Sequence, residues 1–463
     1  MKYKDKFIFL IFAFFLLLGS CEQGKTIPKE EYIKAVSNPA FLHRSVKQLT
    51  DVIVHNTFSP PVASRIYAYP SIAAYEVMRQ TKSAEYQSLS GQLNSFNEIP
   101  IVDDKKVCLE MAAVFAYLNT GKALIFTEDS IVVFQDKLEA EYREIGVPKS
   151  VIKASKTYGE AVAKHVLDWS KSDMYAETRT YPKYDFSAAD VKKGEWIPTP
   201  PDRMDGIEPH WNKIRPLVIK KADQFIPEKP TVYNPEKSSL FYKEVLEVYE
   251  KGKKYSDLEM ENLSAETKEN IAIAQFWDCN PFVSHHGGHA MFATKKITPG
   301  GHWVNITAIV ARQAKSDLMQ TTEAYALTCV ALFDGFISCW DEKYRSNLLR
   351  PETFINEAID RNWKPLLQTP PFPEYTSGHS VISSAAAVTL TSIYGDGFAF
   401  DDTSEEEYGL PMRSFSSFYN ASAEAAISRL YGGIHYMPAI TNGVSQGKDI
   451  GNYIVENVRL SKK

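Results

Sequence analysis

The stretch TSGHSVISSAAAVTLTSIY, residues 376–394, joins a small polar turn to an apolar helical pattern. Ser377 and Gly378 stand just before the apolar run 381–393, so the spacing predicts a helix that begins at this turn. The backbone N–H groups at a helix start attract anions, and a glycine lets a ligand approach the backbone closely. The stretch therefore predicts a helix and, beside His379, one wall of an anion site.

Two further segments supply positive charge. In the first, Lys343 is followed after six residues by Arg350-Pro351, and in the second, Ser428-Arg429 is followed after five residues by His435. An arginine fork grips two oxygens at once, and a lysine adds a point charge. Each segment alone is common in unrelated proteins, but the three together form the inventory of a tetrahedral oxyanion site.

In this combination the chain resembles the superfamily that joins type 2 phosphatidic acid phosphatases, bacterial acid phosphatases and vanadium-dependent haloperoxidases. Their shared pattern is K-x6-R-P, then P-S-G-H, then S-R-x5-H, and only the proline of the second segment is missing here, where Thr376 stands. The resemblance covers residues 276–443, and the segments 276–278, 299–303 and 369–373 resemble the bacterial haloperoxidase-like branch. It implies an all-α helical bundle of the vanadium haloperoxidase and acid phosphatase type.

The resemblance also implies roles for the motif residues. His435 would be the metal ligand of vanadate or the nucleophile toward phosphate, and His379 would be the general acid or base. Asp278 would brace the arginines, and Phe372 stands where fungal chloroperoxidases also carry a phenylalanine. The oxyanion-binding residues would be Lys343, Arg350, Ser377, Gly378 and Arg429, and Lys343 would also be catalytic by drawing charge from bound peroxide.

One position departs from the family in a way that bears on the reaction. Ala439 stands four residues after His435, where the family usually has an aspartate that orients the histidine. Its loss weakens the phosphatase interpretation more, because a nucleophilic histidine depends on that carboxylate. A backbone carbonyl is one group that would orient the ring instead.

We therefore expect a vanadate-dependent haloperoxidase-like enzyme that oxidises halide with hydrogen peroxide. The alternative is an acid phosphatase that hydrolyses phosphomonoesters through a phosphohistidine, with no cofactor and with phosphate in the same site. An inactive binding protein is disfavoured, because no residue of the cage is missing. The formal charge of −5 over 463 residues also argues against a nucleic-acid partner.

The N-terminus has the pattern of an export signal. Lys2, Lys4 and Lys6 precede an apolar run over residues 7–18, and Cys21 follows small residues where a bacterial lipobox is cut. We expect residues 1–20 to be removed, which changes the formal charge from −5 to −7. The chain would then be an exported bacterial lipoprotein, in the periplasm or outer membrane, that touches the membrane only through a lipid on Cys21.

Helical periodicity dominates the rest of the chain. We expect an N-terminal helical region over 21–235, which ends in a proline-rich connection from about 171 to 238, and a catalytic helical domain over 236–463. Patterns of helical spacing cover 42–53, 61–79, 104–125, 130–145, 151–169, 240–249, 266–276, 308–333, 379–394 and 421–431.

Several other residues have two interpretations. His285 and His289 have the spacing of a helical zinc pair, but no HExxH glutamate accompanies them and nearby glycines disfavour a helix, so a surface loop is favoured. His302 and Trp303 would line the site entrance or simply pack in the core. Four cysteines follow Cys21 without CxxC spacing, which favours buried free thiols over a disulfide: Cys108, Cys279, Cys329 and Cys339.

Overall fold

The fold consists almost entirely of helices, so the all-α prediction is confirmed. The computed structural model describes residues 26–184, 192–200, 203–281, 284–287, 290–293 and 295–462. The predicted export signal and Cys21 lie outside these residues. The helices of the first half are α2 (Lys29–Val36), α3 (Ala40–His55), α4 (Pro60–Met78), α5 (Leu109–Lys122), α6 (Glu128–Ile145), α7 (Lys149–Ser170) and α8 (Tyr175–Thr178), with 3-10 turns η1 (Arg79–Lys82), η2 (Trp211–Lys213) and η3 (Ala222–Phe225).

The second half carries the longest helix, α13, and the helices that bear the three motifs. Its helices are α9 (Leu240–Lys251), α10 (Asp257–Glu261), α11 (Ala265–Phe276), α12 (Pro299–Gln313), α13 (Leu318–Ser346), α14 (Pro351–Ala358), α15 (Gly378–Tyr394), α16 (Phe418–Tyr431) and α17 (Met437–Asn457), with the 3-10 turn η4 (Glu406–Tyr408). Two antiparallel pairs of short strands complete the described elements: β1 (Ser284–Gly287) with β2 (Ala290–Ala293), and β3 (Phe400–Asp402) with β4 (Arg413–Phe415).

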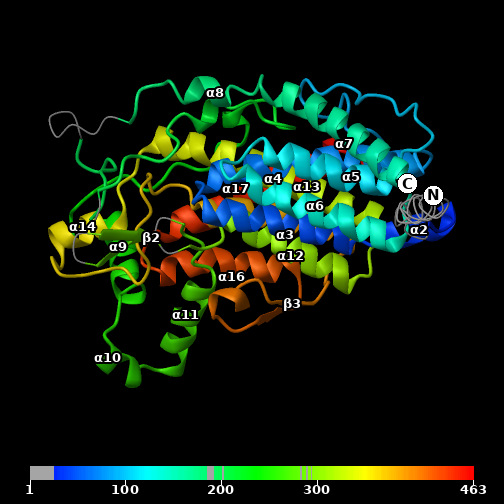
Figure 1. Cartoon of the computed structure of the whole chain (residues 1–463). Coiled ribbons are helices and arrows are strands. Elements are labelled where there is room, and N and C mark those ends of the chain that lie inside the picture. The colour runs from blue at the N-terminus through cyan, green and yellow to red at the C-terminus, as the bar shows by residue number, and fades with distance from the viewer. Residues whose placement is uncertain are drawn as a thin grey trace, which may run out of the picture.

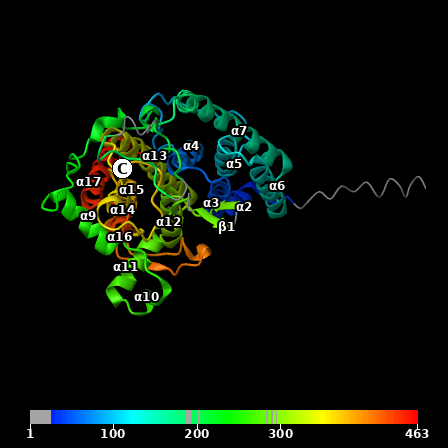
Figure 2. The ribbon, with the colours of Figure 1, turned by 90° about the vertical axis from the view of Figure 1, so that its left-hand side faces the viewer.

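The helices form two adjoining groups that share one core. Viewed end-on, α5, α6 and α7 lie to one side, and α12, α13, α15, α16 and α17 form the other group (Figure 2). Helix α4 joins the groups because it packs against both α5 and α13, and all its residues are buried. One hydrophobic cluster accordingly runs from Tyr32 to Leu460. The proposed boundary near residue 235 stays a prediction.

The sequence patterns locate most of the longer helices, but they include none for α17 (Met437–Asn457) and they miss one break. The periodicity over 308–333 predicts a single helix, whereas the structure ends α12 at Gln313 and starts α13 at Leu318. Lys315 between them has a positive φ of 54°. Asp317 caps α13 by accepting from the backbone N–H of Gln320 at 2.8 Å, and this local capping box overrides the continuous apolar pattern.

The proline-rich connection has little regular structure in its described parts and lies on the second helical group. Asp334 of α13 accepts three backbone hydrogen bonds of 2.7–2.9 Å, from Leu217, Val218 and Ile219. Further along, the backbone N–H of Ile207 donates to the carbonyl of Pro371 at 3.0 Å. The connection therefore covers α13 and holds the loop that precedes α15.

Two smaller predictions concern cysteines and membrane contact. Cys108, Cys279, Cys329 and Cys339 are buried free thiols, as predicted. Among the helices within the described ranges, none is long and apolar enough to cross a bilayer.

Candidate functional site

The three motifs meet at one end of the second helical group, where the ends of four helices converge. Lys343 lies in the last turn of α13, and Arg350 is the residue before α14, which stands at the left-hand end of the molecule in Figure 1. Ser377 caps α15, since its side chain accepts from the backbone N–H of Ser380 at 3.3 Å. Arg429 lies near the end of α16, and His435 follows in the turn to α17.

A small cavity of about 30 Å³ lies between these helix ends. A single water needs roughly 10–15 Å³ of such space, so the cavity has room for more than one water. Gly378, at the start of α15, forms part of its wall. Polar lining comes from Cys279, Asn280, His379, Arg429 and His435, and apolar lining comes from Pro60, Pro281, Pro299, Phe336, Trp340, Pro370, Phe372 and Ile434.

Two arginines bring unsatisfied donors to the site. Arg350 is fully buried: its Nε donates to the carbonyl of Phe372 at 2.9 Å, and its Nη1 lies 2.9 Å from the carbonyl of Ile434 and 3.2 Å from Nε2 of His435. Arg429 donates from Nη1 to the carbonyl of Trp277 at 2.8 Å. Among the described residues, neither Nη2 of Arg350 nor Nε of Arg429 has a hydrogen-bond partner. Burial lowers the pKa of both arginines, that of Arg350 to about 10, so both stay cationic and gain from a bound anion.

Lys343 lies behind the cavity wall. Its Nζ donates to three backbone carbonyls, those of Pro373 at 3.1 Å, Glu374 at 3.0 Å and Thr376 at 2.6 Å. Burial lowers its pKa to about 7. The lysine thus ties down the loop before α15, and its oxyanion role stays a prediction. Ser377 is also buried without lining the cavity.

A carboxylate orients His435, and it comes from an unexpected place. Oε1 of Glu374 lies 2.7 Å from Nδ1 of His435 and also accepts from the backbone N–H of Tyr436 at 3.0 Å. Burial lowers the pKa of His435 well below its usual value, so the ring is neutral. When Nδ1–H donates to Glu374, the lone pair of the ring lies on Nε2, which Nη1 of Arg350 approaches to 3.2 Å, and a bound metal would take the place of that contact.

Sequence reasoning missed Glu374. The residue lies 61 positions before His435, in the loop PPFPEYTSGHS whose other residues carry the resemblance. Ala439, the position where the family usually has aspartate, instead accepts from the backbone N–H of Ser377 at 3.0 Å through its carbonyl. Thr376, the other departure, donates from its hydroxyl to Oε1 of Gln446 at 2.7 Å. A glutamate three residues before the helix cap Ser377, inside an otherwise uncharged segment, was the available signal.

His379 is placed for proton transfer. It lines the cavity and hydrogen-bonds to the backbone of Trp277, and its Nε2 has no partner. Burial and the charge of Arg429 lower its pKa well below the usual value, so the imidazole is neutral and its free nitrogen can accept a proton.

Asp278 lies close to the arginines without pairing with them. Its Oδ2 accepts from Nζ of Lys296 at 2.6 Å, while Oδ1 is buried and has no partner. Its charge opposes the effect of burial on the pKa of Arg429. The predicted role of Asp278 as a brace for the arginines stays a prediction.

The remaining candidates lie apart from the cavity. His302 is fully buried against Trp277, and Trp303 donates from Nε1 to Ser383 at 2.7 Å. Neither residue lines the cavity. His285 lies in strand β1, not in a helix, and His289 lies outside the described residues.

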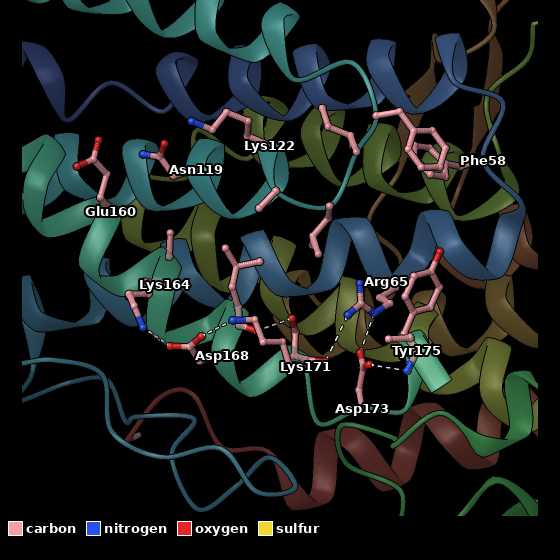
Figure 3. Close-up of a pocket in the computed structure, with 18 residues that line it drawn as sticks. Phe58, Arg65, Asn119, Lys122, Glu160, Lys164, Asp168, Lys171, Asp173 and Tyr175 are labelled. Atoms are coloured by element: carbon pink, nitrogen blue, oxygen red, sulfur yellow. Dashed lines mark hydrogen bonds and ion pairs between the residues drawn. The ribbon is translucent and has the colours of Figure 1, made fainter. Parts of the chain in front are cut away.

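A larger cavity of about 790 Å³ lies between α4, α5 and α7 (Figure 3). Three of its cations are paired: Arg65 donates to Asp173 at 2.7 Å, and Lys164 and Lys171 both pair with Asp168. Because most of its cations already have an acidic partner, this cavity is a weaker anion site than the one at His435.

Comparisons with known proteins agree on one architecture. A family model described as the VCPO second helical-bundle domain matches residues 323–461. The structure described as that of the first bacterial vanadium-dependent iodoperoxidase is 50% identical, covers 95% of this chain and 100% of its own, and has a TM-score of 0.86.

Two more solved structures share the fold alone. The holo form of a bacterial vanadium-dependent chloroperoxidase is 16% identical with a TM-score of 0.61, over 86% of this chain and 92% of its own. Its apo form is 15% identical, has a TM-score of 0.62, and the match covers 87% of this chain and 94% of the apo chain. No curated protein sequence matches the chain significantly.

Proposed function

The chain belongs to the vanadium-dependent haloperoxidase family and is a haloperoxidase-like enzyme. On this premise we propose that iodide is the halide that it oxidises and that His435 binds its vanadate. The observation that carries the choice of iodide is the 50% identity to the iodoperoxidase over 95% of the chain. Iodide is also the most readily oxidised of the common halides, and the lining of Phe336, Trp340 and Phe372 suits a large polarisable ion.

The described residues fit vanadate. A tetrahedral oxyanion would use the free Nη2 of Arg350 and the free Nε of Arg429, both buried without a partner. The start of α15 at Gly378 adds the positive end of a helix dipole. Nε2 of His435 would be the metal ligand, because Glu374 holds the other ring nitrogen. When bound, vanadate would supply the activation of hydrogen peroxide toward a halide.

The protein's own contribution is proton handling and positioning. The free Nε2 of His379 would take a proton from incoming hydrogen peroxide and return it to the departing oxygen. Lys343 would act through the loop that it ties to α13, and its charge would stabilise negative charge that develops in the cavity. Gly378, which lines the cavity, would present its backbone N–H group to the oxyanion. Ser377 would hold this helix start in place, because its own backbone N–H donates to the carbonyl of Ala439.

An acid phosphatase would use the same groups, with His435 as nucleophile. The argument against it from Ala439 does not hold, because Glu374 would orient His435 equally well in either reaction. No feature of the described site favours phosphate ester hydrolysis over halide oxidation.

The experiment compares both activities on the chain without residues 1–21, freed of phosphate and titrated with orthovanadate. We expect vanadate-dependent oxidation of iodide by hydrogen peroxide, faster than that of bromide or chloride, with negligible hydrolysis of p-nitrophenyl phosphate. Faster oxidation of bromide would refute the choice of iodide. Ester hydrolysis that vanadate inhibits, without halide oxidation, would make the protein a phosphatase.

For its location we propose an exported bacterial lipoprotein held by a lipid on Cys21, in the periplasm or outer membrane. Support comes from the sequence pattern of residues 1–21 alone. In cells fed a labelled fatty acid, the full-length chain should carry label and its Cys21→Ser variant should not. Label on both proteins, or on neither, would refute the lipid anchor.

A further inference from the structure

A second group of ligating side chains lies beside the cavity and takes no part in the proposed reaction. Sγ of Cys279 lies 3.4 Å from Nδ1 of His302 and 3.9 Å from Oε1 of Glu405. The His302 and Glu405 atoms are 3.3 Å apart. The three residues come from the segment after α11, from α12 and from the turn before η4, and each is at most 2% exposed.

These separations are those of a tetrahedral zinc site. Bonds of ~2.3 Å to sulfur and ~2.0–2.1 Å to nitrogen or oxygen, at tetrahedral angles, place neighbouring ligand atoms roughly 3.3–3.6 Å apart. The separations of 3.3 and 3.4 Å fall in that range, and the 3.9 Å separation exceeds it by a few tenths of an ångström. Thiolate, imidazole and carboxylate are all zinc ligands, so the cluster satisfies the requirement in both chemistry and spacing.

The surroundings of His302 have the form found around metal-bound histidines. Its other nitrogen, Nε2, lies 2.7 Å from Oδ2 of Asp402. Asp402 is itself held by the backbone N–H of Ser404, which donates to Oδ1 at 2.9 Å. Trp277 stacks on the imidazole with ring centroids 4.5 Å apart. A carboxylate on the far nitrogen directs the lone pair of Nδ1 toward Cys279 and Glu405.

The charges of the cluster also call for a cation. Asp402 and Glu405 bring two buried carboxylates to one imidazole. Within the described ranges neither carboxylate forms an ion pair with a lysine or arginine, since Lys296 donates to Asp278 instead. Two buried carboxylates that share one imidazole have less positive charge near them than their own negative charge, and a divalent cation between them would supply the difference.

We propose that Cys279, His302 and Glu405 bind a zinc ion, with Asp402 as the positioning residue for His302 and water as the fourth ligand. The ion would fix the segment from Trp277 to Cys279. That segment forms a wall of the vanadate cavity: the carbonyl of Trp277 accepts from Arg429, its backbone hydrogen-bonds to His379, and Cys279 lines the cavity. Zinc would thus stabilise the cage without entering the reaction, and the proposal does not depend on which halide is used.

The first test measures metal content. The purified mature protein, loaded with zinc and then gel-filtered, should retain one equivalent of zinc per chain by elemental analysis, independently of its vanadium content. Cys279→Ser and His302→Gln should lose the zinc. Cys329→Ser is the matched control, because Cys329 is equally buried but contacts Ser71 on α4 instead of the cluster, and it should retain the ion.

The second test reads the ligands directly and does not require that the variants fold. Wild-type protein loaded with cobalt in place of zinc should show a thiolate-to-cobalt charge-transfer band, because one ligand is a cysteine. Failure of wild type to retain more than about a tenth of an equivalent of either metal would overturn the proposal. Full zinc retention by a folded Cys279→Ser protein would overturn it equally.

Discussion

Removal of the carboxylate of Glu374 should weaken vanadate binding, because that carboxylate orients the proposed metal ligand. Oε1 accepts from His435 at 2.7 Å and from the backbone of Tyr436 at 3.0 Å, and all three residues are buried. In Glu374→Ala both donors lose their acceptor, and each unsatisfied buried group costs ~1–3 kcal/mol. Loss of such a support to a metal ligand typically lowers affinity ~10–100-fold, so we expect the Kd for vanadate to rise by about 100-fold in this variant.

Glu374→Gln separates charge from geometry. The amide oxygen can still accept both hydrogen bonds, but the charge that strengthens them is gone, and bonds to a charged partner are roughly twice as strong as neutral ones. We expect a rise in Kd of about tenfold for this variant, between wild type and alanine.

The assay is equilibrium titration of phosphate-free protein with orthovanadate, together with thermal unfolding of each variant. Glu76→Gln is the matched control, since Glu76 on α4 is equally buried and accepts from the backbone of Leu89 at 2.6 Å, far along the chain from the site. Its Kd should equal that of wild type. A folded Glu374→Ala protein with wild-type affinity would refute the view that this carboxylate orients His435.

Four further predictions test the cage and the fold. His435→Ala and Arg350→Ala remove the metal ligand and the guanidinium 3.2 Å from it, so both should abolish vanadate binding in equilibrium dialysis, and retained affinity in both would refute the cage. Because phosphate shares the charge and shape of vanadate, added phosphate should inhibit halide oxidation and excess vanadate should restore it; inhibition that vanadate does not reverse would place phosphate elsewhere. Asp334→Asn leaves at least one of the three backbone N–H groups that Asp334 accepts from without an acceptor. The free energy of unfolding should therefore fall by about 1–3 kcal/mol in urea titrations. Asp401 is exposed, so Asp401→Asn is the control and should change this free energy little. Burial raises the pKa of Glu323 from 4.5 to about 7, so the folded chain keeps a proton that the unfolded chain releases, and this residue makes stability fall as pH rises from 4.5 to about 7. Glu323→Gln should therefore stabilise the protein by up to about 3 kcal/mol at pH 8 and not at pH 4. Equal effects at both pH values would contradict the assignment.

The chemistry of the site was predictable because its motifs are local. The spacing of Lys343 and Arg350 and the cap at Ser377 are properties of a few consecutive residues, and helix periodicity and capping act over the same range. The all-α class and the family resemblance follow from such patterns. Where a local signal was overlooked, as at the capping box of Asp317, the predicted helix was too long.

The partners of these residues were not predictable, since they depend on which distant segments pack together. Glu374 binds the ring of His435, which lies 61 positions later in the chain. Nζ of Lys343 donates to three backbone carbonyls in a loop about 30 positions later. No short-range sequence pattern predicts such long-range partners. The alanine at position 439 even suggests, wrongly, that no carboxylate orients His435.

The sequence by itself determined most of the helices, the three motifs and the kind of anion they would bind, because hydrophobic periodicity, caps and charge spacing act between near neighbours. Only the tertiary structure decided which carboxylate orients His435, that Lys343 is bound by carbonyls, and that Cys279, His302 and Glu405 converge. Burial of the apolar helix faces brings those segments together, and within that packed interior each buried polar group must find a partner wherever the chain supplies one.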